Sequence, residues 1–160
     1  MSRVFGIDPG VARLGYGVLD EAPGGRVSVV VFGVISTEPG EVGPRLARVF
    51  DGLEALLAET RPDVAAVEQL FFGQNTTTAL GVSQARGVAL LALARAGVPI
   101  REVTPSQVKQ AVAGWGRADK HQVQAMVARL LSLAAVPQPD DAADALAVAW
   151  SALGARDRAR

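Results

Sequence analysis

Four carboxylates in this sequence fall where an apolar segment ends or a helix begins, which is where open α/β proteins keep their ligands. They are Asp8, Glu68, Asp141 and Asp144. On their own, such acids repel one another and have raised pKa values. A hard divalent cation such as Mg²⁺ or Mn²⁺ removes that cost because it takes oxygen ligands. Two such ions about 3.5–4 Å apart can clamp the attacking and leaving oxygens of a phosphodiester. These residues therefore predict a site for a hard divalent cation.

Each acid also has an ordinary structural explanation. Asp8 precedes Pro9, where an aspartate is common in turns, and acids at a helix start are favoured by capping and by the dipole. Asp140 lies one helical turn before Asp144, so the spacing leaves both Asp140 and Asp141 open as partners of Asp144. Two strand-end acids combined with a helical pair favour a metal site. Zinc is disfavoured because His121 is the only histidine and cysteine is absent.

The elements that must position these acids follow from the apolar periodicity. We expect strands at residues 3–8, 15–19, 27–35, 63–68 and 98–103. We expect helices at residues 45–60, 79–96, 106–113, after a cap at Asp119, and at 140–154. The order predicts an α/β fold with a mixed five-stranded sheet, three antiparallel strands followed by parallel additions, and helices on both faces. If the fourth strand pairs with the first, Asp8 and Glu68 leave neighbouring strand ends.

Length and composition predict one globular domain over residues 1–154, followed by a short basic tail, 155–160, that we expect to be disordered. The 49% apolar and 20% charged residues exclude a disordered chain. No run of eighteen apolar residues is present, so no membrane span is expected. The chain has no signal-peptide layout and no cysteine, which predicts a cytoplasmic location.

The charge balance gives a mixed indication about nucleic acid. The 16 basic and 16 acidic residues cancel, whereas most nucleic-acid-binding domains are basic. Between Arg86 and Arg129, however, eight residues are Lys, Arg or His and only two are acidic. This asymmetry predicts a basic face on a neutral protein.

Five short motifs occur in order along nearly the whole chain. They are Gly6-Ile7-Asp8-Pro9-Gly10 with Gly15-Tyr16-Gly17, Val67-Glu68-Gln69, Gln84-Ala85-Arg86-Gly87, Gln107-Val108-Lys109-Gln110, and Asp141-Ala142-Ala143-Asp144-Ala145-Leu146-Ala147. Any one of them is weak, but together they resemble the RuvC family of bacterial Holliday-junction resolvases. The resemblance implies a ribonuclease-H-like fold, a homodimer, and Mg²⁺-dependent endonuclease cutting of four-way DNA junctions in recombination and repair.

The resemblance also implies roles for individual residues. The family's four catalytic and metal-binding acids fall on Asp8, Glu68, Asp141 and Asp144, which favours Asp141 over Asp140. Two metal ions would promote in-line hydrolysis of two strands of like polarity by a metal-activated water, leaving 5′-phosphate and 3′-hydroxyl ends. RuvA and RuvB, the branch-migration proteins, are implied as partners.

DNA contacts are implied for a further group of residues. Lys109 and Lys120 match lysines that lie near the scissile DNA in the family, and Phe71 matches its base-stacking phenylalanine. The adjacent Phe72 leaves open which ring faces DNA. Arg117, His121 and Arg86 are additional DNA-binding candidates.

The apolar helix expected at 79–96 is either the dimer interface or the buried helix of a monomer.

Three other functions fit parts of the sequence. An actin-like ATPase or sugar kinase also opens with a strand, Gly-Ile-Asp and a glycine turn, but it needs a second similar domain and an adenosine site. A YqgF-like nuclease shares the first motif and acts on RNA, whereas the motifs around Lys109 and Asp141 point away from it. A junction-binding module without catalysis is disfavoured because all four acids are present.

Overall fold

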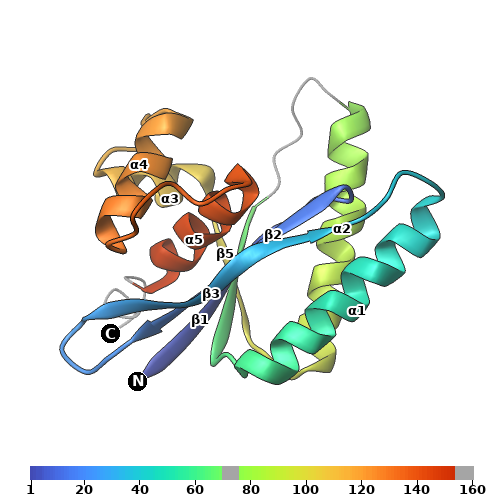
Figure 1. The fold of residues 1–160 in the computed structure, drawn as a ribbon, viewed down its shortest axis with the longest axis horizontal. Helices are drawn as coiled ribbons and strands as arrows, with labels where there is room; N and C mark the ends of the chain where they lie inside the picture. The colour runs from blue at the N-terminus through green and yellow to red at the C-terminus, as the bar shows by residue number, and fades with distance from the viewer. Residues whose placement is uncertain (70–75, 154–160) are drawn as a thin grey trace.

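The computed structural model of the chain describes residues 1–69 and 76–153, which form a five-stranded sheet with helices on both faces (Figure 1). The strands are β1 (Ser2–Asp8), β2 (Arg13–Glu21), β3 (Val27–Ser36), β4 (Val64–Glu68) and β5 (Ile100–Val103). Their order across the sheet is β3-β2-β1-β4-β5. β1, β2 and β3 pair antiparallel, whereas β4 lies parallel to β1 and to β5. The predicted mixed sheet and the pairing of the first and fourth strands are confirmed.

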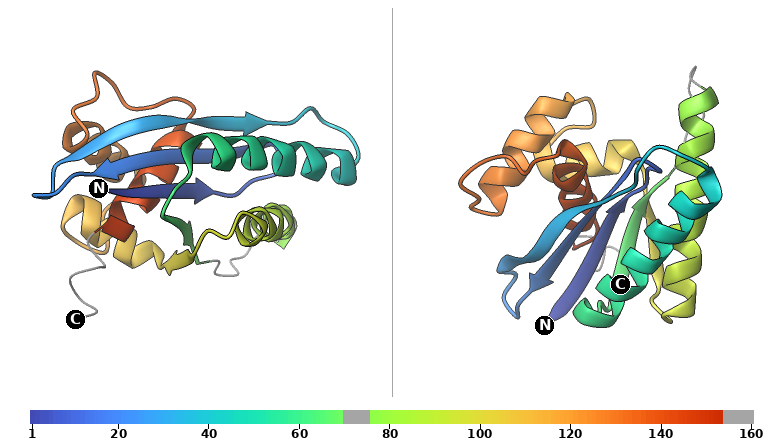
Figure 2. Two further views of the ribbon diagram at one scale, coloured as in Figure 1. Left: turned by 90° about the horizontal axis from the view of Figure 1, so that it is seen from below. Right: turned by 45° about the vertical axis from the view of Figure 1, so that its right-hand side comes forward.

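The helices divide between the two faces of the sheet (Figure 2). They are α1 (Val42–Thr60), α2 (Thr76–Arg95), α3 (Pro105–Ala113), α4 (Lys120–Leu130) and α5 (Asp140–Leu153). One hydrophobic core contains buried residues of α1 and α2, and the other contains buried residues of α3, α4 and α5. Of the helices in the described part of the chain, none is long and apolar enough to cross a membrane.

The two cores follow from the alternation of side chains along each strand. In β1, Phe5 and Ile7 belong to the core beneath α1 and α2, whereas Val4 belongs to the core beneath α5. In β4, Ala65 and Val67 likewise face α1 and α2. Both strands are therefore buried on both faces, which explains why they appear in the sequence as continuous apolar runs.

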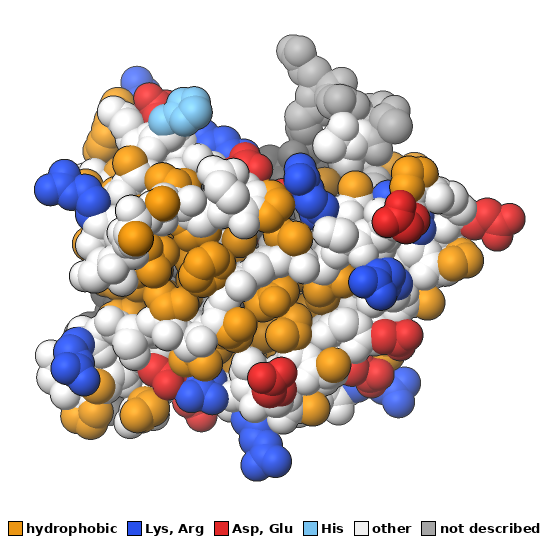
Figure 3. Space-filling model, in the orientation of Figure 1, with side chains coloured by type: hydrophobic (Ala, Val, Ile, Leu, Met, Phe, Trp, Pro, Cys, Tyr) orange, Lys and Arg blue, Asp and Glu red, His pale blue; other side chains and the backbone are white. Residues whose placement is uncertain are grey.

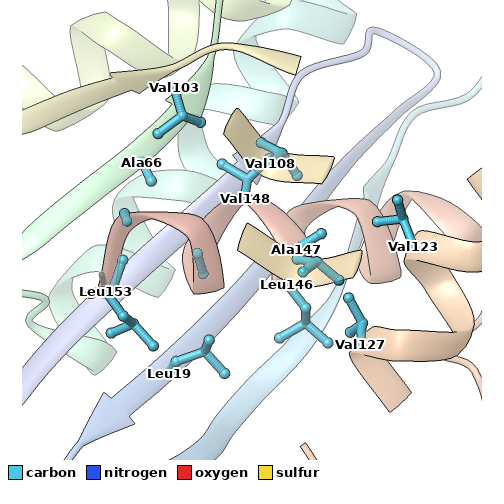
Figure 4. Packing of buried hydrophobic residues seen from close by; sticks show 14 of the residues in the cluster. Leu19, Ala66, Val103, Val108, Val123, Val127, Leu146, Ala147, Val148 and Leu153 are labelled. Atoms are coloured by element: carbon cyan, nitrogen blue, oxygen red, sulfur yellow. The ribbon is translucent and has the colours of Figure 1, made fainter. Parts of the chain in front are cut away.

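α5 is the central element of the second core and lies between the sheet and the helices α3 and α4 (Figure 4). Its residues Leu146, Ala147 and Val148 are each at most 1% exposed. Val108 of α3 and Val127 of α4 close the outer side of the same cluster. The position of α5 over β1 and β2 thus depends on packing from both sides.

Several boundaries differ from the sequence prediction for physical reasons. α1 begins at Val42 although a loop is expected as far as Pro44, because the N–H groups of a first helical turn have no intrahelical partner and proline loses nothing there. β5 begins at Ile100 because Val98 still bonds back to Leu93 at the end of α2. The predicted caps of α3 and α4, Thr104 and Asp119, are confirmed as capping boxes. The expected tail, 155–160, lies outside the described residues.

Candidate active site

Asp8 and Glu68 leave neighbouring parallel strands at the same edge of the sheet. The register pairs Ile7 of β1 with Val67 of β4, and each acid is the next residue of its strand. Side chains two apart on a strand share a face, so Asp8 projects on the same side as Val4 and Glu68 on the same side as Ala66. Both carboxylates therefore project on the face covered by α5.

Glycines on β1 and β2, which have no side chain, let α5 approach the sheet closely. A Cβ built on Gly15 would lie 2.1 Å from the carbonyl oxygen of Asp141, and one built on Gly6 would lie 2.1 Å from that of Ala145. Gly15 pairs directly with Asp8 across β1 and β2. The glycines thus bring the N-terminal part of α5, with Asp141 in its first turn and Asp144 in the next, against the end of β1.

Asp8 shows the electrostatic effect of this arrangement. Burial is the largest influence on its pKa, followed by the negative charges of Asp144, Asp141 and Glu68, and together they raise it to about 8. Lys120 acts in the opposite direction. The structure therefore brings the four predicted acids into one interacting group, with Asp8 at its centre.

Two of the other acids are also buried enough to disfavour their charged forms. Burial raises the pKa of Glu68, the charge of Asp144 adds to that rise, and the charge of Lys109 opposes it. Burial likewise raises the pKa of Asp144, and its contact with Lys120 opposes the rise. The two predicted lysines therefore lie within electrostatic reach of the carboxylates from α3 and α4.

The N-terminal part of α5 holds three acids, Asp140, Asp141 and Asp144, and they face two different basic partners. Asp141 Oδ2 lies 3.3 Å from Arg13 Nε, yet this buried oxygen has no hydrogen-bond partner because the contact lacks hydrogen-bond geometry. Lys120 Nζ lies 2.8 Å from Asp140 Oδ2 and 3.3 Å from Asp144 Oδ2. The hydrogen bond between Lys120 and Asp140 raises the pKa of the lysine and lowers that of the aspartate. Asp141 is among the charges that raise the pKa of Asp8.

A cavity of about 270 Å³ opens beside the strand ends. It is lined by Asp8, Pro9, Glu68, Gln69, Val82, Arg86 and Pro105. A larger hollow of about 690 Å³ lies between β3 and α1, where apolar side chains are exposed (Figure 3), but none of the four acids lines it. The smaller cavity therefore gives a substrate access to Asp8 and Glu68.

The donor set fits a hard divalent cation. Its members are carboxylates, Asp141 Oδ2 is buried without a hydrogen bond, and the pKa of Asp8 is raised by like charges that a cation would offset. Within residues 1–69 and 76–153, no three His, Cys, Asp or Glu side chains are preassembled as a metal site.

The remaining predicted residues have varied surroundings. Arg86 lines the small cavity, its Nη2 pairs with Glu102, and its buried Nε has no hydrogen-bond partner. Arg117 and His121 are exposed beside the start of α4. Phe71 and Phe72 lie outside the described residues. On the face shown in Figure 3, basic side chains are spread over several elements and do not form one patch.

Sequence reasoning missed Arg13, Gln124 and the contact made by Asp140. Gln124 Nε2 lies 3.5 Å from Asp144 Oδ1, at the outer limit of a hydrogen bond. The alternating glycines of β2, at 15 and 17, were the available signal that a helix packs closely there. No local signal identifies Arg13, because its partner Asp141 is remote in the chain.

Comparison with known proteins gives consistent matches over most of the chain. A family model described as crossover junction endodeoxyribonuclease RuvC matches residues 4–152. The protein of that name from Chloroflexus aggregans is 57% identical over 148 residues, covering 92% of this chain and 90% of the relative. The one from Heliobacterium modesticaldum is 55% identical and covers 91% and 90%.

Solved structures match the fold as well. T. thermophilus RuvC in complex with Holliday junction substrate has a TM-score of 0.91 at 38% identity, covering 99% of this chain and 97% of the other. A yeast mitochondrial Holliday junction resolvase has a TM-score of 0.67 at 16% identity and covers 99% and 84%, which shows a shared fold alone.

Proposed function

The chain belongs to the RuvC family of crossover junction endodeoxyribonucleases, and from this premise we propose that it cuts four-way DNA junctions. The observation that carries the proposal is the meeting of Asp8, Glu68, Asp141 and Asp144 at one sheet edge beside an open cavity. The reaction is hydrolysis of phosphodiester bonds in two strands of like polarity, which leaves 5′-phosphate and 3′-hydroxyl ends.

The same four acids are the proposed catalytic residues and the proposed ligands of a divalent metal. We propose Mg²⁺, with Mn²⁺ as a substitute and two ions in each site, because the donors are oxygens. Such ions, when bound, activate a water molecule and stabilise negative charge on the phosphodiester. The chain's own contribution is to hold the acids at fixed strand and helix ends and to leave the cavity beside Asp8 and Glu68 open to a DNA strand.

Lysines and arginines around the carboxylates are the proposed phosphate contacts. Lys109 and Lys120 lie within electrostatic reach of the acids, so a phosphate held by them is close to the site of hydrolysis. Arg86 in the cavity and the exposed Arg117 and His121 are further candidates. We also propose that Phe71 or Phe72 stacks on unpaired bases at the crossover.

We further propose that residues 1–154 act as one nuclease domain and that the protein works in the cytoplasm as a homodimer. A two-fold dimer presents two identical sites to the two strands of a junction. RuvA and RuvB are the proposed partners in branch migration, an assignment that rests on family membership.

The decisive experiment compares a mobile four-way junction with a linear duplex of the same sequence in Mg²⁺. We expect cutting of the junction alone, and equal cutting of both would show a general nuclease instead.

Asp8→Asn should lower the cutting rate at least about 100-fold while junction binding is retained, because it removes a charge from the centre of the site. Full activity in that variant would contradict the assigned site.

A further inference from the structure

Lys120 is the one basic side chain that the described structure places against two acids of α5. Its Nζ lies 2.8 Å from Asp140 Oδ2 and 3.3 Å from Asp144 Oδ2. The lysine side chain is 59% exposed, so packing does not hold it in place. Its position therefore depends on these two ionic contacts.

The contacts come from matched positions on two helices. Lys120 and Gln124 are one turn apart on α4, and Asp140 and Asp144 are one turn apart on α5. Lys120 reaches both acids, while Gln124 approaches Asp144 Oδ1 at 3.5 Å. Asp140 is thus the second acid that holds the lysine, and it makes the shorter contact.

The backbone under Lys120 is fixed independently. Asp119 caps α4 by accepting a hydrogen bond of 2.8 Å from Gln122 N, and Asp119 N donates a bond of 2.9 Å to Gln122 Oε1. Lys120 is the first residue of the helix after this cap. Once the backbone is anchored, only the flexible lysine side chain has to be positioned, and Asp140 makes the shorter contact with it.

We propose that Asp140 is a positioning residue that holds the Lys120 ammonium group beside Asp144. Without Asp140, the lysine would either pair with Asp144 alone, where it competes with a metal ion, or leave the site. With Asp140 present, the ammonium group is shared between two acids, so it stays within reach of a DNA phosphate and competes less strongly with a metal ion for Asp144. This inference rests on the proposed function, because its catalytic consequence is measured in junction cutting.

An exposed ion pair contributes little to folding stability, so the expected effect is on catalysis. Asp140→Asn should lower kcat for junction cutting about tenfold. Junction affinity should stay within about threefold of the wild type or become tighter, since a negative charge is lost near the phosphate. Asp140→Glu keeps a carboxylate on the same helix face and should retain kcat within about threefold. Asp51→Asn, the same change on the exposed side of α1, is the matched control and should leave kcat unchanged.

The role through Lys120 is tested in a double-mutant cycle. In the Lys120→Ala background, Asp140→Asn should have no further effect on kcat, because the group that it positions is gone. An unchanged kcat in the single variant, or an equal loss in both backgrounds, would overturn the proposal. A loss of junction binding that accounts for all of the rate loss would overturn it too.

A spectroscopic measurement tests the contact without relying on cleavage. Lys109 and Lys120 are the only lysines in the sequence, so the metal-free protein labelled with ¹⁵N-lysine gives two side-chain ammonium signals. Asp140→Asn should shift the Lys120 signal and leave the Lys109 signal in place. An unmoved Lys120 signal would refute the positioning role. If the wild type fails to cut junctions, the proposed function falls, whereas the NMR result still decides whether Asp140 holds Lys120.

Discussion

Asp8 combines burial with three nearby negative charges, and this raises its pKa to about 8. In the absence of metal, the folded protein therefore keeps a proton that an unfolded aspartate loses above about pH 4. Below that pH, Asp8 is protonated in both the folded and the unfolded protein, so its raised pKa does not lower the free energy of unfolding. Between about pH 4 and pH 8 the unfolded state ionises first, so stability falls as the pH rises and levels off above about pH 8.

Asp8→Asn should accordingly stabilise the metal-free protein in alkaline buffer. At pH 8 we expect a gain of about 1–3 kcal/mol, or about 2–8 °C in Tm, because a neutral amide replaces the buried acid. At pH 4 the gain should nearly vanish. Calorimetry in EDTA measures both values, with Asp51→Asn as an exposed control. The same gain at both pH values would mean that Asp8 does not titrate as the structure indicates.

Lys109 illustrates a second kind of contribution, because its charge acts on Glu68 from α3. If it contacts a DNA phosphate, Lys109→Ala should weaken junction binding and lower the slope of log K against log[salt] by about 0.9. Titrations at several salt concentrations with Ca²⁺ or EDTA measure the slope without cleavage. Arg26→Ala, in the β2–β3 turn at the opposite end of β1, should change neither quantity. An unchanged slope for Lys109→Ala would remove this residue from the interface.

Among the elements, α5 packs so closely on the sheet that the strand positions directly beneath it must be glycine. Gly6→Ala would place a Cβ 2.1 Å from the Ala145 carbonyl oxygen, and backbone cannot rotate aside as a side chain can. We expect a loss of about 1–3 kcal/mol in the free energy of unfolding. Denaturant unfolding measures it. Gly43→Ala, in the exposed first turn of α1, meets nothing within 4 Å and should stabilise by about 0.4–1 kcal/mol. Equal effects of the two substitutions would show that α5 does not pack as closely as described.

This packing also shows what the sequence can and cannot predict. Apolar periodicity is local, so it located all five strands and all five described helices to within a few residues. The early start of α1 was missed because Pro44 is a breaker in most contexts but not in a first turn. The acids were predictable as strand ends and a helical pair. The contacts Arg13–Asp141 and Lys120–Asp140 were not, since they depend on how remote segments meet.

At the scale of the whole molecule, helix α2 exposes large apolar side chains that no other part of the described chain covers. Ala85, Ala89 and Leu93 bury one side of this helix in the core. On another side, Leu80 and Leu91 are 62% and 54% exposed, and they lie three turns apart on one face. Apolar side chains in such a stripe favour a second copy of the chain as the cover. The sequence left this helix as either a dimer interface or the buried helix of a monomer. A substitution on the exposed face can distinguish the two.

Leu91→Glu tests the dimer and its consequence together. A buried charge at a two-fold interface is present twice, so we expect sedimentation to change from dimer to monomer at micromolar concentration. A junction extruded from a supercoiled plasmid should then accumulate single nicks instead of paired ones, because each monomer carries one group of four acids and cuts one strand. Leu130→Glu on α4, also at an exposed leucine, should leave both readouts unchanged. If Leu91→Glu remains dimeric, the interface lies elsewhere. If it is monomeric and still cuts the two strands together, pairing of sites does not coordinate the cuts.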